Sequence, residues 1–254
     1  MSYRIWLSPS KGMQRLTELP DGIIPTEPPF ASEALRFGKK LAQLNATQNA
    51  QLHSVSAALA QATTQMHQVW WKDYPAGLGA PAALSYTGDA YAGLQAQHWS
   101  ADTWNRAKEH LRIGSGLYGF LRPTDRVLPY RCEMGLSWPL GVASGPTAFW
   151  KNRITPVLAR ELQGDWLLDL SSSEYGAVLD AAGLKAPILR CDFREIKNGK
   201  PVFVSVFGKR ARGSMARHVL ERSGPLLEVV DSFSIDGYAL NSALSTPTLR
   251  VFTR

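Results

Sequence analysis

The fold is decided by the stretch His110-Leu-Arg-Ile-Gly-Ser-Gly-Leu-Tyr-Gly-Phe-Leu-Arg-Pro123, followed by Pro129-Tyr-Arg-Cys-Glu-Met-Gly135. Between its glycines and prolines it carries ionisable and phenolic side chains: Arg112, Tyr118, Arg122, Asp125, Tyr130, Arg131 and Glu133. Buried charges are costly unless they are paired, and loops held on a rigid scaffold often carry binding groups. We therefore expect a polar site for an anionic ligand here.

Bulk composition describes an ordinary folded chain with an excess of positive charge. Its 254 residues are 44% hydrophobic and 19% charged, which is typical of soluble globular proteins. The net charge of +7 favours an anionic partner such as nucleic acid, a nucleotide or an acidic surface. Solubility alone would explain the same charge equally well.

Several classes are excluded by what the sequence lacks. No run of about 18 apolar residues could span a membrane, and no signal-peptide pattern opens the chain. Two cysteines, Cys132 and Cys191, suit a reducing compartment better than a disulfide framework. The five histidines and two cysteines show no metal-ligand spacing. We expect a cytoplasmic monomer with no membrane contact, metal or cofactor.

Hydrophobic periodicity predicts the main elements in order. Residues 3–7 read as a strand that ends at Ser8-Pro-Ser-Lys-Gly12, which places Lys11 where ligands often meet strand ends, although a solvated loop lysine is the alternative. Helices are predicted over 34–44 and over 52–69. Residues 166–170 form a short apolar strand that leads into the polar turn Ser171-Ser-Ser-Glu-Tyr175.

A second chemical feature follows a predicted hairpin. Strands over 188–195 and 202–207 are joined through Asn198-Gly199, a strong hairpin signal. The second strand leads into Gly208-Lys-Arg-Ala-Arg-Gly213, where a helix is expected to begin. Free helix N–H groups and fixed cations could converge there on one anion. A solvated basic turn is an equally good interpretation.

The glycine-rich part of the central stretch does not support nucleotide binding. Gly114-Ser-Gly-Leu-Tyr-Gly119 matches G-x-G-x-x-G, but that motif needs a strand before it and a helix after it. Here a helix is predicted before it, and Pro123 follows soon after. Ser115 also fails the G-x-S-x-G pattern of hydrolases, and no Walker A, H-E-x-x-H or C-x-x-C pattern occurs.

Taken together, a series of segments along the sequence shows that the chain resembles the YaaA family of peroxide-stress proteins. The matching segments are Ser8-Pro-Ser-Lys11, Gly88-Asp-Ala-Tyr-Ala-Gly-Leu94, the His110–Gly119 and Leu121–Asp125 segments, Pro129–Gly135, Phe149-Trp150, Leu170–Tyr175, Lys197–Lys200, Lys209–Gly213 with Met215 and Arg217, and Gly237-Tyr238. They run in register through most of the chain, which makes the resemblance specific.

The resemblance implies a single α+β domain over 1–254, with a mixed sheet surrounded by helices and a positively charged cleft. It also implies a helix-hairpin-helix-like element, duplex DNA binding, and a role in limiting oxidative damage when iron and peroxide meet. The sequence departs from the family pattern at Ser10 and Gly12. It departs again at Ala58, Thr63 and Met66, where the family usually carries a lysine, an asparagine and an arginine.

Two functions follow, together with a structural alternative. In the first, Lys209, Arg210, Arg212 and Arg217 contact DNA phosphates without reading sequence. In the second, an enzyme acts on a small anionic substrate, a nucleotide or activated carboxylate: Glu133 or Glu174 is the base, Lys11 or Lys209 is electrophilic or nucleophilic, and Arg131 with Arg212 clamps the anion. In the third, the same side chains form only an internal salt-bridge network.

Both functional hypotheses need Lys11, the Arg131–Glu133 loop and the basic 209–212 segment to meet around one electropositive hollow. The other expected ligand-binding residues are Ser8, Asp89, Tyr91, Arg112, Tyr118, Arg122, Tyr130, Ser172 and Tyr175.

Overall fold

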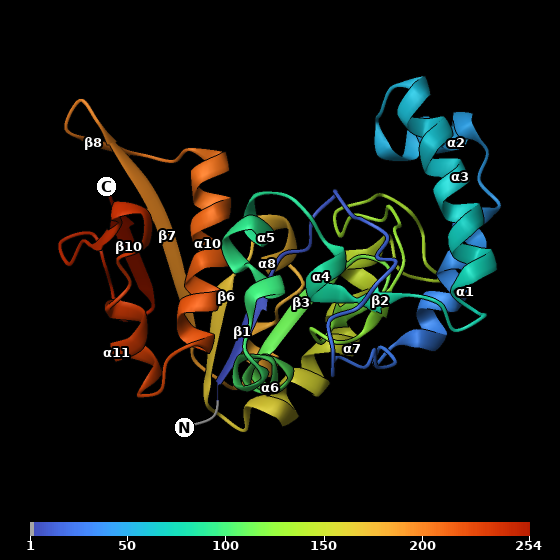
Figure 1. The fold of residues 1–254 in the computed structure, drawn as a ribbon. Coiled ribbons are helices and arrows are strands. Elements are labelled where there is room, and N and C mark those ends of the chain that lie inside the picture. The colour runs from blue at the N-terminus through green and yellow to red at the C-terminus, as the bar shows by residue number, and fades with distance from the viewer. Residues whose placement is uncertain (1–2) are drawn as a thin grey trace.

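The computed structural model describes residues 3–254, which form a mixed sheet surrounded by helices (Figure 1). In spatial order the main sheet contains β4 (Gly119–Leu121), β3 (Leu111–Ser115), β1 (Tyr3–Leu7), β6 (Trp166–Leu170), β7 (Ile188–Lys197), β10 (Leu249–Thr253) and β9 (Ala239–Leu240), while β8 (Lys200–Val202) pairs with β7. A small second sheet pairs β2 (Ala80–Pro81) with β5 (Arg126–Val127). The α+β class implied by the resemblance is confirmed.

Five central strands of the main sheet run parallel, and their order creates a crevice. β1 pairs with β3 on one side and with β6 on the other, so that Leu7 lies opposite both Ile113 and Leu170. The chain goes from β1 to β3 and then crosses back to β6, which makes β1/β6 the point where connections diverge. Ligands of open α/β sheets bind outside the carboxyl ends of strands at such a point.

Helices cover the sheet and extend beyond it. The longer ones are α1 (Ala31–Ala42), α2 (Ala46–His53), α3 (Ala57–Asp73), α6 (Ala101–His110), α7 (Pro146–Leu162) and α10 (Ser205–Leu220). The shorter ones are α4 (Ala82–Ser85), α5 (Asp89–Leu94), α8 (Ser173–Gly176), α9 (Ala181–Leu184), α11 (Leu226–Asp231) and the 3₁₀ turns η1 (Ala96–His98) and η2 (Ile235–Gly237). α10 lies along β1, β6 and β7 and packs most extensively against α5. No helix among residues 3–254 is both long and apolar enough to cross a bilayer.

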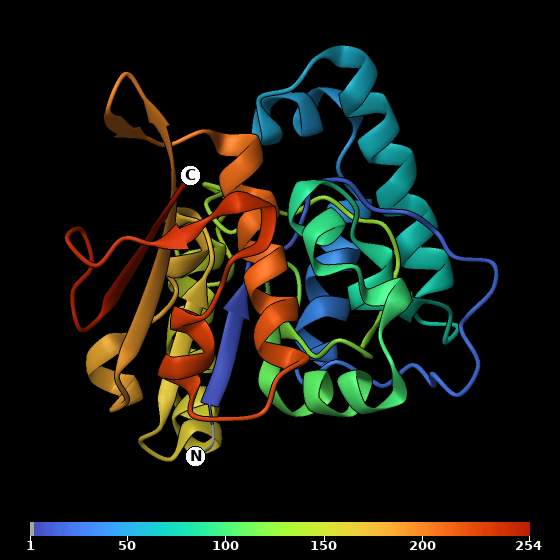
Figure 2. The same cartoon turned by 60° about the vertical axis from the view of Figure 1, so that its left-hand side comes forward.

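Two projections rise from the end of the sheet toward which β1 points. Figures 1 and 2 show the α2–α3 pair on one side and the β7–β8 hairpin on the other, both reaching past the body of the molecule. We call them the helical arm (residues 46–73) and the hairpin (residues 188–202).

Close packing, rather than phosphate binding, explains the glycine-rich centre. A Cβ added at Gly116 would lie 2.3 Å from the carbonyl oxygen of Cys132. The indole Nε1 of Trp150 donates to the Gly116 carbonyl at 2.8 Å. Glycine therefore lets the 129–135 segment lie directly against the turn between β3 and β4, and this contact fixes the backbone of Arg131 and Glu133.

Most predicted strands are confirmed, but two expectations are wrong. Residues 202–207 are not a strand, because β8 ends at Val202 and α10 begins at Ser205. Residues 52–69 are not one helix, because Ser54 adopts a left-handed conformation (φ 51°) and Ser56 caps a new helix. Both segments are apolar enough to mislead a pattern, yet Leu59, Val69 and Phe207 are exposed.

Gly114–Gly119 does not form a dinucleotide-binding turn, but the elements around it differ from those predicted. A strand does enter the motif, since β3 separates it from α6. What excludes a dinucleotide site is the following element, because Gly119 begins antiparallel strand β4 and no helix N-terminus is available there for a phosphate.

The contact between α5 and α10 yields a stability prediction. A Cβ on Gly213 would lie 1.7 Å from the carbonyl oxygen of Ala90, which is backbone and cannot move without separating the two helices. We expect Gly213→Ala to destabilise the protein by about 3 kcal/mol in urea unfolding, at the upper end of overpacking costs. Gly135→Ala is the control, because its Cβ would have an ordinary 3.4 Å neighbour. Equal stabilities would contradict the close approach.

Candidate functional site

A cavity of about 420 Å³ lies at the carboxyl ends of β1 and β6. Eleven of the residues expected at a ligand site line it: Ser8, Lys11, Asp89, Tyr130, Arg131, Glu133, Ser172, Glu174, Tyr175, Lys209 and Arg212. The three segments expected to meet do share one hollow, at the crevice that the strand order creates. The hollow is not purely basic, because three carboxylates face it alongside four cations.

The floor joins the ends of the two strands. The backbone N–H of Ser172 donates to Ser8 Oγ at 2.9 Å. The hydroxyl of Tyr91 donates to the Ser8 carbonyl at 3.2 Å. Tyr91 is therefore a support beneath Ser8 and does not itself line the cavity, and the two serines present short hydroxyl groups at its base.

Glu133 is the most heavily partnered group of the site. Arg131 Nε donates to its Oε1 at 2.9 Å, Lys11 Nζ lies 3.8 Å from the same oxygen, and His53 Nδ1 donates to Oε2 at 2.9 Å. Burial alone would raise the pKa of Glu133, but the hydrogen bond and charge of His53 and the charge of Arg131 lower the pKa to about 2. A carboxylate held ionised with both oxygens occupied is a poor general base, so Glu133 positions its neighbours.

Two histidines connect the helical arm to the loop that carries Arg131 and Glu133, and the sequence analysis predicted neither contact. His53 ends α2 and contacts Glu133, while His67 Nε2 on α3 lies 2.9 Å from the Arg131 carbonyl oxygen. Burial lowers the pKa of His67 to about 4, so this ring is neutral at pH 7. Single histidines in an uncharged helical stretch give no sequence signal, since only the fold brings them to Glu133 and Arg131.

Glu174 is the carboxylate best placed for proton transfer. Its Oε1 accepts a hydrogen bond from the Gly135 N–H at 2.9 Å, which fixes the side chain at the cavity wall. No hydrogen bond or ion pair to its other oxygen occurs among residues 3–254. One anchored and one available oxygen are what a positioned base needs.

Lys209 and Arg212 lie within α10 and not at its beginning. α10 starts at Ser205, so the amides of 209–212 are engaged inside the helix, and the expectation of free N–H donors beside these cations is wrong. Their side chains nevertheless line the cavity. Arg212 makes no ion pair or hydrogen bond with any residue in 3–254, and burial lowers its pKa, partly opposed by the charges of Asp192 and Asp169.

Tyr130 and the Cys132 thiol in the cavity wall are structural. Tyr130 shares hydrogen bonds with Ser115 Oγ at 2.6 Å and with the Tyr86 hydroxyl at 2.7 Å. Burial raises the pKa of Tyr130 well above 10, and burial also raises the pKa of the Cys132 thiol. Neither group ionises near neutral pH, so neither is a nucleophile or base here.

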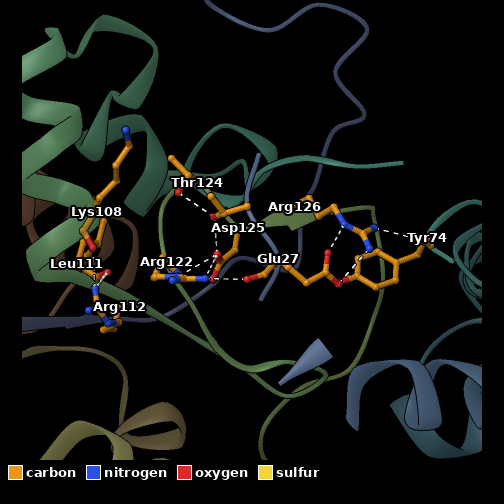
Figure 3. A network of polar contacts seen from close by, with 10 residues as sticks. Glu27, Tyr74, Lys108, Leu111, Arg112, Arg122, Thr124, Asp125 and Arg126 are labelled. Atoms are coloured by element: carbon orange, nitrogen blue, oxygen red, sulfur yellow. Dashed lines mark hydrogen bonds and ion pairs between the residues drawn. The ribbon is translucent and has the colours of Figure 1, made fainter. Parts of the chain in front are cut away.

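Three residues of the central stretch lie elsewhere and have structural partners. Arg112 Nε on β3 donates to Glu161 on α7 at 2.8 Å, and Tyr118 accepts a hydrogen bond from Trp70 Nε1 at 2.8 Å in the core. Figure 3 shows Arg122 bonded to Asp125, with a further bond from Arg122 Nη2 to the backbone carbonyl of Glu27. The third hypothesis, an internal network of salt bridges, therefore describes Arg112 and Arg122.

Two expected phosphate contacts on α10 also face away from the cavity. Arg210 pairs with Asp236 at 3.4 Å, and Arg217 bonds to the side chain of Gln95. Because a helix turns 100° per residue, only Lys209 and Arg212 of this basic run can face the hollow together. No group of three or more metal-ligating side chains occurs in residues 3–254.

Comparisons with known proteins agree over nearly the whole chain. The family model described as peroxide stress protein YaaA matches residues 3–244. Curated relatives carry the name UPF0246 protein: one from Flavobacterium johnsoniae is 34% identical over 99% of this chain and 100% of its own length. Others from Paracidovorax citrulli and Delftia acidovorans are 35% and 36% identical, each over 98% of this chain and 97% of their own length.

The environment of Glu133 predicts a pH-dependent stability. Its folded pKa of about 2 lies below the ordinary value of 4.5. The ionised carboxylate therefore stabilises the fold above about pH 4.5, and this contribution is lost as the pH falls toward 2. Glu133→Gln should cost roughly 3 kcal/mol at pH 7, because it leaves Arg131 and His53 without their partner. Urea unfolding at pH 7, 4 and 3 should show the gap between the two proteins narrowing with acid. A constant gap would mean that Glu133 is not held as an anion.

Proposed function

This chain belongs to the YaaA family of peroxide stress proteins. We propose that it binds a small anionic molecule in the cavity at the ends of β1 and β6 and performs proton-transfer chemistry on it. The observation that carries the proposal is the Arg212 guanidinium, which lines the cavity, is largely withdrawn from water and has no anionic partner within 4 Å in residues 3–254.

An unpaired, partly buried cation is costly, and the cost is offset when an anion binds. Arginine is suited to carboxylate and phosphate groups because its planar fork can donate two parallel hydrogen bonds. Lys209 lies one helical turn away on the same wall and adds a second positive charge. The cavity volume of about 420 Å³ lies toward the small end of the range of roughly 300–1,000 Å³ for small-molecule pockets.

The surrounding groups support a division of roles. Arg212 and Lys209 would hold the anionic group, and Glu174, anchored by Gly135, would take a proton at its available oxygen. Arg131 is held by Glu133 through its Nε, which leaves its terminal nitrogens to orient the ligand. Lys11 has a 69% exposed side chain and lies 3.8 Å from Glu133, so it sits at the mouth.

Ligand binding can be tested without knowing the reaction. Inorganic phosphate and simple carboxylates should raise the melting temperature of the native protein by mass action. Arg212→Met should remove at least 80% of that shift, since charge-assisted hydrogen bonds contribute about 1.5–3 kcal/mol. Arg160→Met, an exposed arginine on α7, is the matched control and should leave the shift unchanged. A full shift in the Arg212 variant would overturn the proposal.

DNA binding is the second candidate, and a different surface favours it. Residues 196–208 contain Lys197, Lys200 and no acid, and they expose Ile196, Val202, Phe203, Val206 and Phe207. Cations that contact phosphates beside exposed aromatic rings are typical of nucleic-acid binding. The helical arm is less suited to this role, because residues 41–71 contain no Asp, Glu, Lys or Arg. Thr63 is also buried, with its hydroxyl bonded to the Leu59 carbonyl.

This second candidate predicts a change in salt dependence. Combining Lys197→Gln with Lys200→Gln in the hairpin should reduce the slope of log K against log salt by about 2 for duplex DNA, if both lysines contact phosphates. Lys39→Gln with Lys40→Gln on α1 is a control of equal charge change on another surface. Fluorescence anisotropy across a salt series measures both. An unchanged slope, or no binding of the native protein at low salt, would exclude DNA binding by the hairpin.

A further inference from the structure

The charges of the cavity do not add up to a simple anion site. Glu133 already contacts Arg131, Lys11 and His53, so this cluster supplies its own counter-charges. The groups that remain are two cations and two carboxylates: Lys209 and Arg212 against Asp89 and the available oxygen of Glu174.

These remaining charges do not neutralise one another. No ion pair within 4 Å links Asp89 or Glu174 to Lys209 or Arg212 in residues 3–254. Asp89 has no hydrogen bond or ion pair of its own there either, and it lies at the start of α5, which Gly213 holds tightly against α10. The two cations and the two carboxylates therefore lie apart on the walls of one cavity, and each can bind a ligand group of opposite charge.

We propose that the ligand is a small zwitterion, a molecule with a separate carboxylate and primary ammonium group, such as an α-amino acid. Its carboxylate meets Arg212 and Lys209, and its ammonium meets Asp89 and Glu174. The inference rests on the proposed function, because it specifies the ligand class of the same cavity.

Charge explains why a zwitterion fits better than a multiply charged anion. A phosphate monoester would bring about two negative charges into a space that already holds two unpartnered carboxylates, and like charges this close repel. A monocarboxylate without an amine would leave Asp89 and Glu174 dehydrated and unpaired. Only a ligand carrying both signs satisfies all four groups together.

The experiment compares ligands that differ by one charge. The proteinogenic amino acids are screened by thermal shift on the native protein, and the strongest is titrated calorimetrically beside its N-acetyl derivative, its carboxamide and inorganic phosphate. We expect the amino acid to bind at least ~10-fold more tightly than either derivative, because each lacks one charge-assisted contact.

Two variants locate the two ends of the ligand. Asp89→Asn should abolish the preference for the free amine over the N-acetyl form but keep the preference for carboxylate over carboxamide. Arg212→Met should do the reverse. Asp21→Asn, an exposed aspartate outside the cavity, is the control and should keep both preferences. Melting of each variant without ligand establishes that it is folded.

The outcomes separate the two levels of the proposal. Phosphate or the N-acetyl derivative binding as tightly as every amino acid would overturn the zwitterion and leave the anion site standing. A preference for the free amine that survives Asp89→Asn would also overturn it. No shift with any of these probes would remove both the inference and the proposed function.

Discussion

The ionised carboxylate of Glu133 holds the site together. Through one oxygen it fixes Arg131, which lies two residues away on the same loop, and through the other it receives His53 from the end of α2. The loop can be there only because Gly116 lets the Cys132 carbonyl approach the β3–β4 turn. The hydrogen bond and charge of His53 and the charge of Arg131 are also what hold the pKa of Glu133 near 2.

Some charged residues of this protein are paired within the fold, whereas others, in the cavity, are not. Around β5, the guanidinium groups of Arg122 and Arg126 each have a partner: Asp125 for the first, and Glu27 with the ring of Tyr74 for the second (Figure 3). These pairs fasten the N-terminal segment to the body. In the cavity, Arg212 and Asp89 have no ion pair or hydrogen bond with any residue in 3–254, although the Phe203 ring lies 5.8 Å from the Arg212 guanidinium. A polar group that the fold leaves without a counter-charge is better evidence for a ligand than the number of charges.

Sequence reasoning could predict which segments meet, but not which side chains turn toward the meeting point. The strands over 3–7 and 166–170 and the Asn198-Gly199 turn are local patterns, and they were confirmed. The orientation of α10 was out of reach, because whether Arg210 or Arg212 faces the cavity depends on how the helix is rotated about its axis when it packs against α5 and the sheet. The apolar run 202–207 suggested a strand there, whereas α10 already begins at Ser205. His53 and His67 were likewise hidden, since their role arises only when the helical arm folds back over Glu133.

The geometry separates the two candidate functions in space, and this separation has a physical reason. Duplex DNA presents a dense row of phosphates that cannot enter a hollow of about 420 Å³. The end of the hairpin and the exposed start of α10 have the opposite character, with Lys197, Lys200, exposed phenylalanines and no acid between 196 and 208. α10 belongs to both surfaces: Lys209 and Arg212 face the cavity, while its first turn carries the exposed Val206 and Phe207. A ligand held by Arg212 would therefore contact the same helix that follows the hairpin, so α10 links the two surfaces directly.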